Sequence, residues 1–323
     1  MNRFLSFADY ADSGTYRKIK SRMTNSNCSE SVRALLSEIV DYAGLFPPSQ
    51  LSMPDAVNNY ANYKNSNYNW MLGRFVVSMA RLDEFSDNAR NFLTNSKFSV
   101  WKLSVLASDD ISETIRQIED FNAANAPFAV CDSIEAKAVT TRMIEEITEF
   151  VQANFVVYFE LPLNENLAGL VSAVAKRGQR AKIRTGGITE NAFPKNEKII
   201  HFMKTCLAAN IPFKATAGLH HPLRCRKSLT YDKDAPTGTM NGFLNVFLAA
   251  GFLRQGFQES LISELLEDER AENFTFNAGG VLWRQEYFIS TAQLKILRDK
   301  SIISFGSCSF EEPIADLKEI GIL

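Results

Sequence analysis

Hydrophobic and polar positions follow two alternating periods from about residue 74 to the end of the chain. Short apolar stretches with the two-residue period of a strand alternate with longer stretches that have the 3.6-residue period of a helix. Strands separated by helices must run parallel, and eight such units predict an α/β fold, a closed (β/α)8 TIM-type barrel. A doubly wound open parallel sheet is the alternative, because no sequence pattern proves closure. The eight expected strands are RFVVS, SVWKLSVL, FAVCDSIEAK, NFVVYFELPL, AKIRTGG, IPFKATAG, NFTFNAGG and SIISFGS.

Residues 1–70 have a different pattern, which indicates an extension rather than part of the barrel. The first 28 residues are polar and mixed, and the next stretch, SVRALLSEIVD, has helical spacing. The FPP sequence then forces a turn, after which Ser52 is placed to cap a helix that begins at Met53. We therefore predict an N-terminal helical extension, residues 1–70, packed on a barrel that spans residues 71–323.

The alternation within each expected strand separates side chains that face the helices from side chains that face the barrel interior. In the fourth strand, for example, Phe155, Val157 and Phe159 face the helices. This interior is far more polar than a structural core requires, and charged groups at strand C-terminal ends lie where barrel enzymes bind substrates. The expected interior residues of the first four strands are Arg74, Lys102, Ser104, Cys131, Ser133, Glu135, Lys137, Val156, Tyr158 and Glu160.

A basic pair of strands lies between residues 181 and 224. In the fifth expected strand Lys182 and Arg184 share one face, and in the sixth Lys214 and Thr216 share one face. Because the two strands are parallel neighbours, we expect these side chains to converge with His220, and Glu160 can balance only one of the cations. The sequence therefore predicts a site for a small carboxylate or phosphate, with substrate-binding residues Lys182, Arg184, Thr216, His221 and Arg224.

Three residues of this region are candidates for catalysis. Lys214 is a candidate Schiff-base or proton-transfer lysine, because cationic neighbours would lower its pKa towards neutrality. The alternatives are a fixed cation that binds the anion and a structural ion pair with Glu160. Glu160 is a candidate general base, with an ion pair or a metal ligand as alternatives, and His220 is the third candidate.

The adjacent His220 and His221 also suggest a zinc site. Adjacent residues in an extended chain point apart, and neither an HxH nor an HExxH spacing accompanies the pair. We therefore predict no metal and no cofactor.

Small-residue turns after the last two expected strands give a second signal. Barrels often bind phosphate there, on bare backbone N–H groups. Cys308 has small and apolar neighbours, which favours an inert thiol. The additional substrate-binding candidates from these turns are Asn277, Gly279, Gly280, Gly306 and Ser307.

Composition limits the possible partners and compartment. A net charge of −2 gives no reason to expect nucleic acid or an anionic membrane surface as a partner. The five cysteines form no CxxC pair, which is typical of reduced thiols. No signal peptide or long apolar run is present, so we expect a soluble cytoplasmic protein. Assembly into a homo-oligomer is left open.

Two segments, DYAGLFPP at residues 41–48 and FKATAGLHHPLR at residues 213–224, resemble a family of uncharacterised bacterial proteins. That resemblance extends over most of the chain and implies no activity. Lys214 with the small residues after it also resembles the lysine strand of class I aldolases of the deoxyribose-phosphate type, and Lys182 would match their second lysine. The chain departs from that motif, because Gly218-Leu219-His220 replaces the expected glycine pair. KIRTGG with the later HHPLR is similar to the basic strand ends of quinolinate-type phosphoribosyltransferases, with a different spacing.

These observations predict an enzyme of the lyase or aldolase type that acts on a small anionic carbonyl compound at the C-terminal mouth of the barrel. A phosphoribosyl- or glycosyl-transfer enzyme is one alternative, in which the basic residues would hold phosphates without a covalent adduct. A non-catalytic barrel that binds an anionic ligand is the other.

Overall fold

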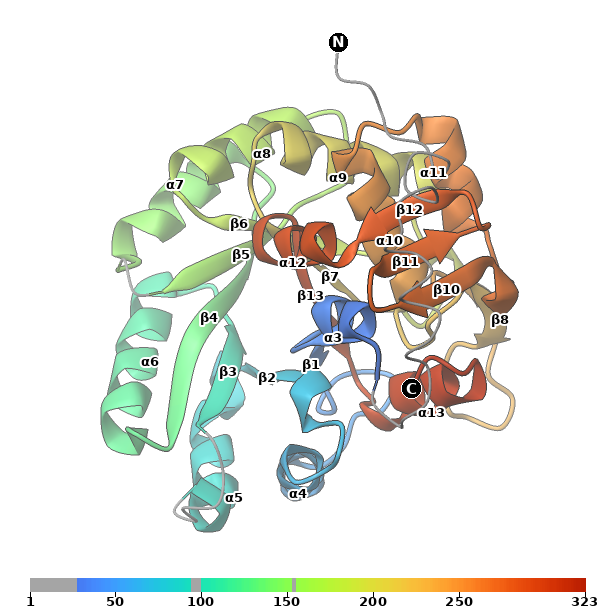
Figure 1. The fold of residues 1–323 in the computed structure, drawn as a ribbon. Helices are drawn as coiled ribbons and strands as arrows, with labels where there is room; N and C mark the ends of the chain where they lie inside the picture. The colour runs from blue at the N-terminus through green and yellow to red at the C-terminus, as the bar shows by residue number, and fades with distance from the viewer. Residues whose placement is uncertain (1–27, 94–99, 153–154) are drawn as a thin grey trace.

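A closed barrel of eight parallel strands forms the centre of the molecule (Figure 1). The computed structural model describes residues 28–93, 100–152 and 155–323, and the expectation for residues 1–27 lies outside this range. The predicted (β/α)8 barrel is confirmed, because β1 pairs with both β2 and β13 and so closes the sheet. The strands in order around the barrel are β1 (Val40–Tyr42), β13 (Ile302–Ser307), β7 (Phe213–Thr216), β6 (Arg180–Arg184), β5 (Val156–Glu160), β4 (Ala129–Lys137), β3 (Trp101–Leu106) and β2 (Leu72–Ser78).

Within the described residues, helices surround the barrel, and capping residues in the sequence mark where some of them begin or end. Ser52 accepts a hydrogen bond from the backbone N–H of Asp55 and caps α4, as expected. Gly178, with φ of 65°, follows the end of α8, as expected. The helices are α3 (Glu30–Leu36), α4 (Met53–Lys64), α5 (Leu82–Leu93), α6 (Ile111–Asn125), α7 (Thr141–Phe150), α8 (Leu167–Lys176), α9 (Asn196–Ala208), α10 (Phe243–Arg254), α11 (Glu259–Leu266), α12 (Thr291–Lys300) and α13 (Glu311–Glu319), with short 3-10 turns η1 (Asn69–Met71), η2 (Met79–Arg81), η3 (Glu190–Ala192) and η4 (Ala271–Asn273).

The barrel begins earlier in the chain than the sequence suggested. The helix expected up to residue 41 ends at Leu36, and the next strand, β1, lies within the range assigned to an N-terminal extension. Glu38 has a positive φ of 48°, and its N–H donates to the Trp70 carbonyl, so the chain leaves the helix at this point. A strand of three residues is too short to show a period of two. The expected boundary at residue 71 therefore cuts through the barrel, and α4 belongs to the ring of helices.

The segment expected as the seventh barrel strand belongs to a separate sheet. β10 (Phe274–Asn277), β11 (Gly280–Trp283) and β12 (Tyr287–Ser290) form a three-stranded antiparallel sheet outside the barrel. The small residues of NAGG make a tight reversal, in which the Asn277 side-chain oxygen accepts from the backbone N–H groups of Gly279 and Gly280. The hairpin therefore returns on itself, and the barrel count of eight is completed by β1.

The expected separation of interior and helix-facing side chains is confirmed where the strands hold charges. Val157 and Phe159 of β5 are fully buried in the hydrophobic core, whereas Glu160 pairs with Lys182 of the neighbouring strand β6 inside the barrel. A bulge in β4 leaves Asp132 without a partner in β3. Its carboxylate binds Arg74 at 2.7 Å. The interior is thus filled by charged side chains, and the apolar core lies between the barrel and its helices.

A long excursion follows β7. It contains the two-stranded antiparallel hairpin of β8 (Cys225–Ser228) and β9 (Thr237–Met240). This excursion leaves the C-terminal end of the barrel, so its residues lie near the mouth of the barrel rather than in the ring of helices.

Candidate functional site

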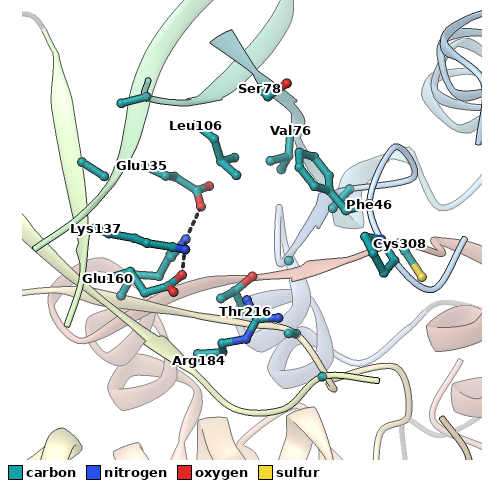
Figure 2. Close-up of a pocket in the computed structure, with 18 of the residues that line it drawn as sticks. Phe46, Val76, Ser78, Leu106, Glu135, Lys137, Glu160, Arg184, Thr216 and Cys308 are labelled. Carbon is teal, nitrogen blue, oxygen red and sulfur yellow. Dashed lines mark hydrogen bonds and ion pairs between the residues drawn. The ribbon is translucent and has the colours of Figure 1, made fainter. Parts of the chain in front are cut away.

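A pocket of about 890 Å³ lies at the C-terminal mouth of the barrel. Its lining combines residues from strand ends with residues from the loops that follow them. Figure 2 shows Glu135, Lys137, Glu160 and Arg184 on one side of this pocket, and Cys308 on the opposite side. Barrel enzymes bind substrates at this end of the strands.

The floor of the pocket is the top of a buried chain of alternating charges. Lys182 lies 2.8 Å from Glu160 and 2.8 Å from Glu135. Glu135 also lies 2.6 Å from Lys214, which lies 2.7 Å from Asp41. The chain of ion pairs therefore crosses the barrel from β5 to β1.

The lower part of this chain is closed to solvent. The side chains of Lys214, Asp41 and Glu135 are 2%, 1% and 4% exposed. Ser304 donates a hydrogen bond to Asp41, and Ser104 donates one to Glu135. Both hydroxyls bond to the carboxylate oxygen that Lys214 also binds, while Asp41 Oδ1 accepts from the Arg74 N–H and Glu135 Oε2 binds Lys182. Every oxygen of the two carboxylates thus has a partner, a requirement for ion pairs taken out of water.

The environment of Lys214 reverses the expectation that its pKa is lowered. Burial alone would lower the pKa of Lys214, but the carboxylates of Asp41 and Glu135 raise it above its ordinary value. The Tyr158 ring, 5.1 Å from the ammonium nitrogen, adds a cation–π contact. Lys214 is therefore a fixed cation at neutral pH, and its side chain does not line the pocket.

Glu135 is the carboxylate that makes this arrangement possible. Burial would raise the pKa of Glu135, but Lys182 and Lys214 hold that pKa well below its usual range. Glu160 balances only Lys182, as expected, but Glu135 binds both lysines and Asp41 binds Lys214. Those two lysines are neutralised within the barrel and leave no charge for an external anion.

Lys137 and Arg184 differ from the buried lysines. Both are exposed at strand ends, both line the pocket, and neither has a carboxylate within ion-pair distance among the residues that the structure describes. Lys137 lies opposite Glu160 on the neighbouring strand, and Arg184 lies opposite Thr216. These two side chains are the cations that remain available at the mouth.

The rest of the pocket wall is largely apolar. Phe46 comes from the FPP segment after β1, and Val76 and Leu106 come from the ends of β2 and β3 (Figure 2). Such a wall contacts the carbon skeleton of a ligand, while the charged side holds its polar end. The pocket lining therefore combines a charged side with an apolar side.

The histidines and Arg224 lie apart from the buried charges. His220 lines the pocket, and its Nδ1 lies 3.1 Å from Glu312 Oε2. His221 instead contacts Asp316 at 2.5 Å, and Arg224 lies 3.6 Å from Glu269. Neither His221 nor Arg224 lines the pocket.

The small-residue turns are divided between two places. Gly306 lies at the end of β13 and lines the pocket with Thr216. Ser307 is buried, and its hydroxyl accepts from the Ser309 N–H. Asn277, Gly279 and Gly280 form the hairpin turn outside the barrel and do not reach the pocket. The expected phosphate site at two neighbouring strand ends is therefore not formed by these residues, because the hairpin replaces the expected strand.

The residues described by the structure contain no group of three or more His, Cys, Asp or Glu side chains arranged to hold a metal ion. His220 and His221 make separate contacts with different carboxylates of α13. The pair therefore does not form a zinc site by itself.

Several residues of the site were missed by reasoning from the sequence. Asp41 lies in a strand too short to recognise, although it begins the DYAGLFPP segment. Glu135 and Lys137 were expected in the interior without a role. Cys308 was expected to be inert, yet its neighbours include His220 and Tyr231. Only the spacing of polar residues in β4 could have indicated Glu135.

No protein-family model matches the chain, and no curated protein is similar to it in sequence. Within residues 28–93, 100–152 and 155–323, no helix combines the length and apolar character needed to cross a membrane. Function must therefore be inferred from the site itself.

Proposed function

We propose that the chain is a lyase-type enzyme for a small carbonyl compound that carries one carboxylate or phosphate group. The observation that carries this proposal is the position of Lys137 and Arg184 at the mouth, beside the Glu160–Lys182 pair. Two cations without an ion-pair partner in the described part of the chain, next to a carboxylate that can accept a proton, supply the minimum for binding and deprotonation.

The formal charges support a singly charged anion as the ligand. The buried chain contains three carboxylates and two ammonium groups, which gives a net charge of −1. Lys137 and Arg184 add two positive charges and change the sum to +1. One anionic group between Lys137 and Arg184 would bring this set of seven side chains to neutrality, and the carboxylates of Asp109 and Glu146, which also line the pocket, are outside the set.

Glu160 is the proposed base. Its side chain is 16% exposed, so it reaches the pocket while keeping its contact with Lys182. In a retro-aldol cleavage, Glu160 removes the hydroxyl proton of the substrate, a carbon–carbon bond breaks, and the electron pair forms an enolate. The Lys182 ammonium group stabilises the enolate oxygen, and the proton returns to the enolate carbon.

A Schiff base on Lys214 is not part of this proposal. Lys214 is 1% exposed, does not line the pocket, and is held as a cation by two carboxylates. An amine nucleophile must be deprotonated and reachable by the substrate. The resemblance to the lysine strand of class I aldolases therefore does not carry over to a role for Lys214 as a nucleophile.

Anion binding is tested by thermal unfolding in phosphate, succinate or chloride at matched ionic strength. A ligand that binds only the folded state raises the melting temperature by mass action. We expect phosphate or succinate at millimolar concentration to raise it, and Lys137→Met or Arg184→Met to abolish the effect. Arg177→Met is the matched control, because Arg177 is exposed beyond the end of α8, at the opposite end of the barrel. Equal effects of phosphate and chloride in the wild-type protein would contradict the proposal.

Turnover is tested with a panel of aldols and keto acids that carry a carboxylate or a phosphate. We expect Glu160→Gln to reduce kcat by about 10² or more, the usual contribution of a general base. Borohydride treatment should add no mass to Lys214, and a trapped adduct there would restore the Schiff-base alternative. Release of a free base or pyrophosphate would indicate phosphoribosyl or glycosyl transfer, and tight binding without turnover would indicate a non-catalytic barrel.

A further inference from the structure

A second group of reactive side chains surrounds Cys308 on the pocket wall. Cys308 lies between the end of β13 and the start of α13, and it lines the pocket. Its sulfur lies 4.0 Å from Nδ1 of His220 and 3.7 Å from the Tyr231 hydroxyl. Figure 2 shows Cys308 across the pocket from Lys137 and Glu160. This group is therefore separate from the chain of buried ion pairs.

Glu312 holds the imidazole of His220 in place. Its Oε2 atom lies 3.1 Å from His220 Nδ1 and accepts a hydrogen bond of 3.0 Å from the Tyr231 hydroxyl. A nucleophile, a base and a carboxylate in contact with the base are the parts of a nucleophilic centre. Here the carboxylate and the sulfur both approach Nδ1 of His220, unlike a catalytic triad, in which they contact different ring nitrogens. His220 comes from the loop after β7, Cys308 from the loop after β13 and Glu312 from the start of α13, while Tyr231 comes from the β8–β9 hairpin.

The charges of this group favour a thiolate. Burial alone would raise the pKa of the Cys308 thiol, but the hydrogen bond from His220 and its positive charge lower that pKa below its ordinary value. Burial alone would lower the pKa of His220, but its contacts with Cys308 and Glu312 raise it to about 9. The other titratable groups that face the pair are Tyr42, Tyr231, His221 and Glu312.

The other cysteines provide a comparison within the same chain. Burial raises the pKa of Cys131 to about 12 and the pKa of Cys225 to about 11. Neither thiol has a histidine in contact among the interactions of the described residues. These two structural thiols thus have a raised pKa, and Cys308 differs from them because its sulfur contacts His220.

We propose that Cys308 is a nucleophile that adds to the carbonyl carbon of an aldehyde bound in the pocket, with His220 as its acid partner. The thiolate sulfur forms a bond to the carbonyl carbon, and the carbonyl π electrons move onto the oxygen. The His220 imidazolium gives its proton to that oxygen, which leaves a neutral imidazole and a thiohemiacetal. This step needs no other reactant and does not depend on the function proposed for Glu160, Lys137 and Arg184.

Alkylation by iodoacetamide, followed by peptide mass spectrometry, tests the state of the sulfur. The thiolate is the form that reacts, so the rate for an ordinary thiol rises about tenfold per pH unit below its pKa. We expect Cys308 to react at pH 6.5 at least roughly 100-fold faster than Cys225. A Cys308 rate equal to or below that of Cys225 at pH 6.5 would overturn the proposal.

Variants distinguish an activated thiolate from a thiol that is merely accessible. In His220→Gln the rate of Cys308 labelling should rise with pH as for an ordinary thiol. His201→Gln, at an exposed position of α9, should leave the labelling of Cys308 unchanged. Tyr231→Phe is a second variant at an exposed position, and it should slow labelling at pH 6.5 without loss of folding. If none of the variants at residues 220 and 231 changes the labelling profile, the proposed pair does not exist.

Butyraldehyde is the probe for the covalent step. We expect it to protect Cys308 from iodoacetamide in a reversible, concentration-dependent manner, and to leave the labelling of Cys225 unchanged. Protection that persists in Arg184→Met would separate this centre from the proposed anion site. Rapid labelling of Cys308 without protection by the aldehyde would refute the aldehyde as ligand class.

Discussion

Replacement of Lys214 by Met tests whether the buried charge chain stabilises the barrel. The ammonium nitrogen of Lys214 lies 2.7 Å from Asp41 and 2.6 Å from Glu135. After the change, Glu135 keeps Lys182 at 2.8 Å, whereas Asp41 keeps only hydrogen bonds from Ser304 and the Arg74 backbone. The variant therefore leaves one buried carboxylate without a cation.

Leaving that carboxylate buried without a cation should remove a large part of the free energy of unfolding of a typical domain. Removal of one partner from a buried ion pair costs about 3–5 kcal/mol, because the remaining charge stays buried without compensation. Lys295→Met is the matched control, since Lys295 pairs with Glu30 at 2.8 Å while both side chains are 60% exposed. Exposed pairs contribute about 0–1 kcal/mol.

Urea unfolding at pH 8 and pH 5, monitored by circular dichroism, measures the loss of unfolding free energy in Lys214→Met and in Lys295→Met. Protonation of the uncompensated carboxylate removes the buried charge, so the cost of Lys214→Met should shrink as the pH is lowered. In the wild-type protein the pKa of Glu135 is lower in the folded state than in the unfolded state, so the pH dependence has the opposite sign. The ionised Glu135 contributes its full stabilisation above the pKa of the unfolded state, and this stabilisation is lost as the pH falls towards the pKa of the folded state. Adding Asp41→Asn should recover part of the loss. A cost for Lys214→Met as small as for Lys295→Met, at both pH values, would refute the reasoning.

Three further predictions concern other parts of the chain. Gly218→Ala should destabilise more than Gly178→Ala in urea unfolding: both have positive φ, 72° and 65°, but an added methyl group meets neighbouring atoms at 2.7 Å only at Gly218. Asn245→Ala should lower the unfolding free energy by about 1–3 kcal/mol, because this buried amide bonds three backbone groups that would lose their partner. His220→Gln should lower the free energy of unfolding most below pH 6.5 and progressively less as the pH rises through about 9, because the pKa of His220 is raised in the folded state from 6.5 to about 9. A loss of unfolding free energy that grows with pH would contradict this prediction.

The sequence by itself determined the class of fold and much of the interior. Helical and strand periods are local properties, so eight alternating units predicted the barrel before any contact was known. The two-residue period also placed Glu135, Glu160, Lys182 and Lys214 on the inner face, where they are found. The error at the seventh strand had a local cause as well, because a short apolar segment does not reveal whether its partner is parallel or antiparallel.

The tertiary structure alone decided which charges meet. Asp41 and Lys214 are 173 residues apart, and they form a pair because closure of the barrel places β1 and β7 on either side of β13. The same folding brings His220 to Cys308 and Glu312 from separate segments. The ionisation of a side chain depends on its distance from other charges and on its exclusion from water, neither of which is a local property of the sequence. That is why the sequence located the lysines correctly but could not show that carboxylates already neutralise them.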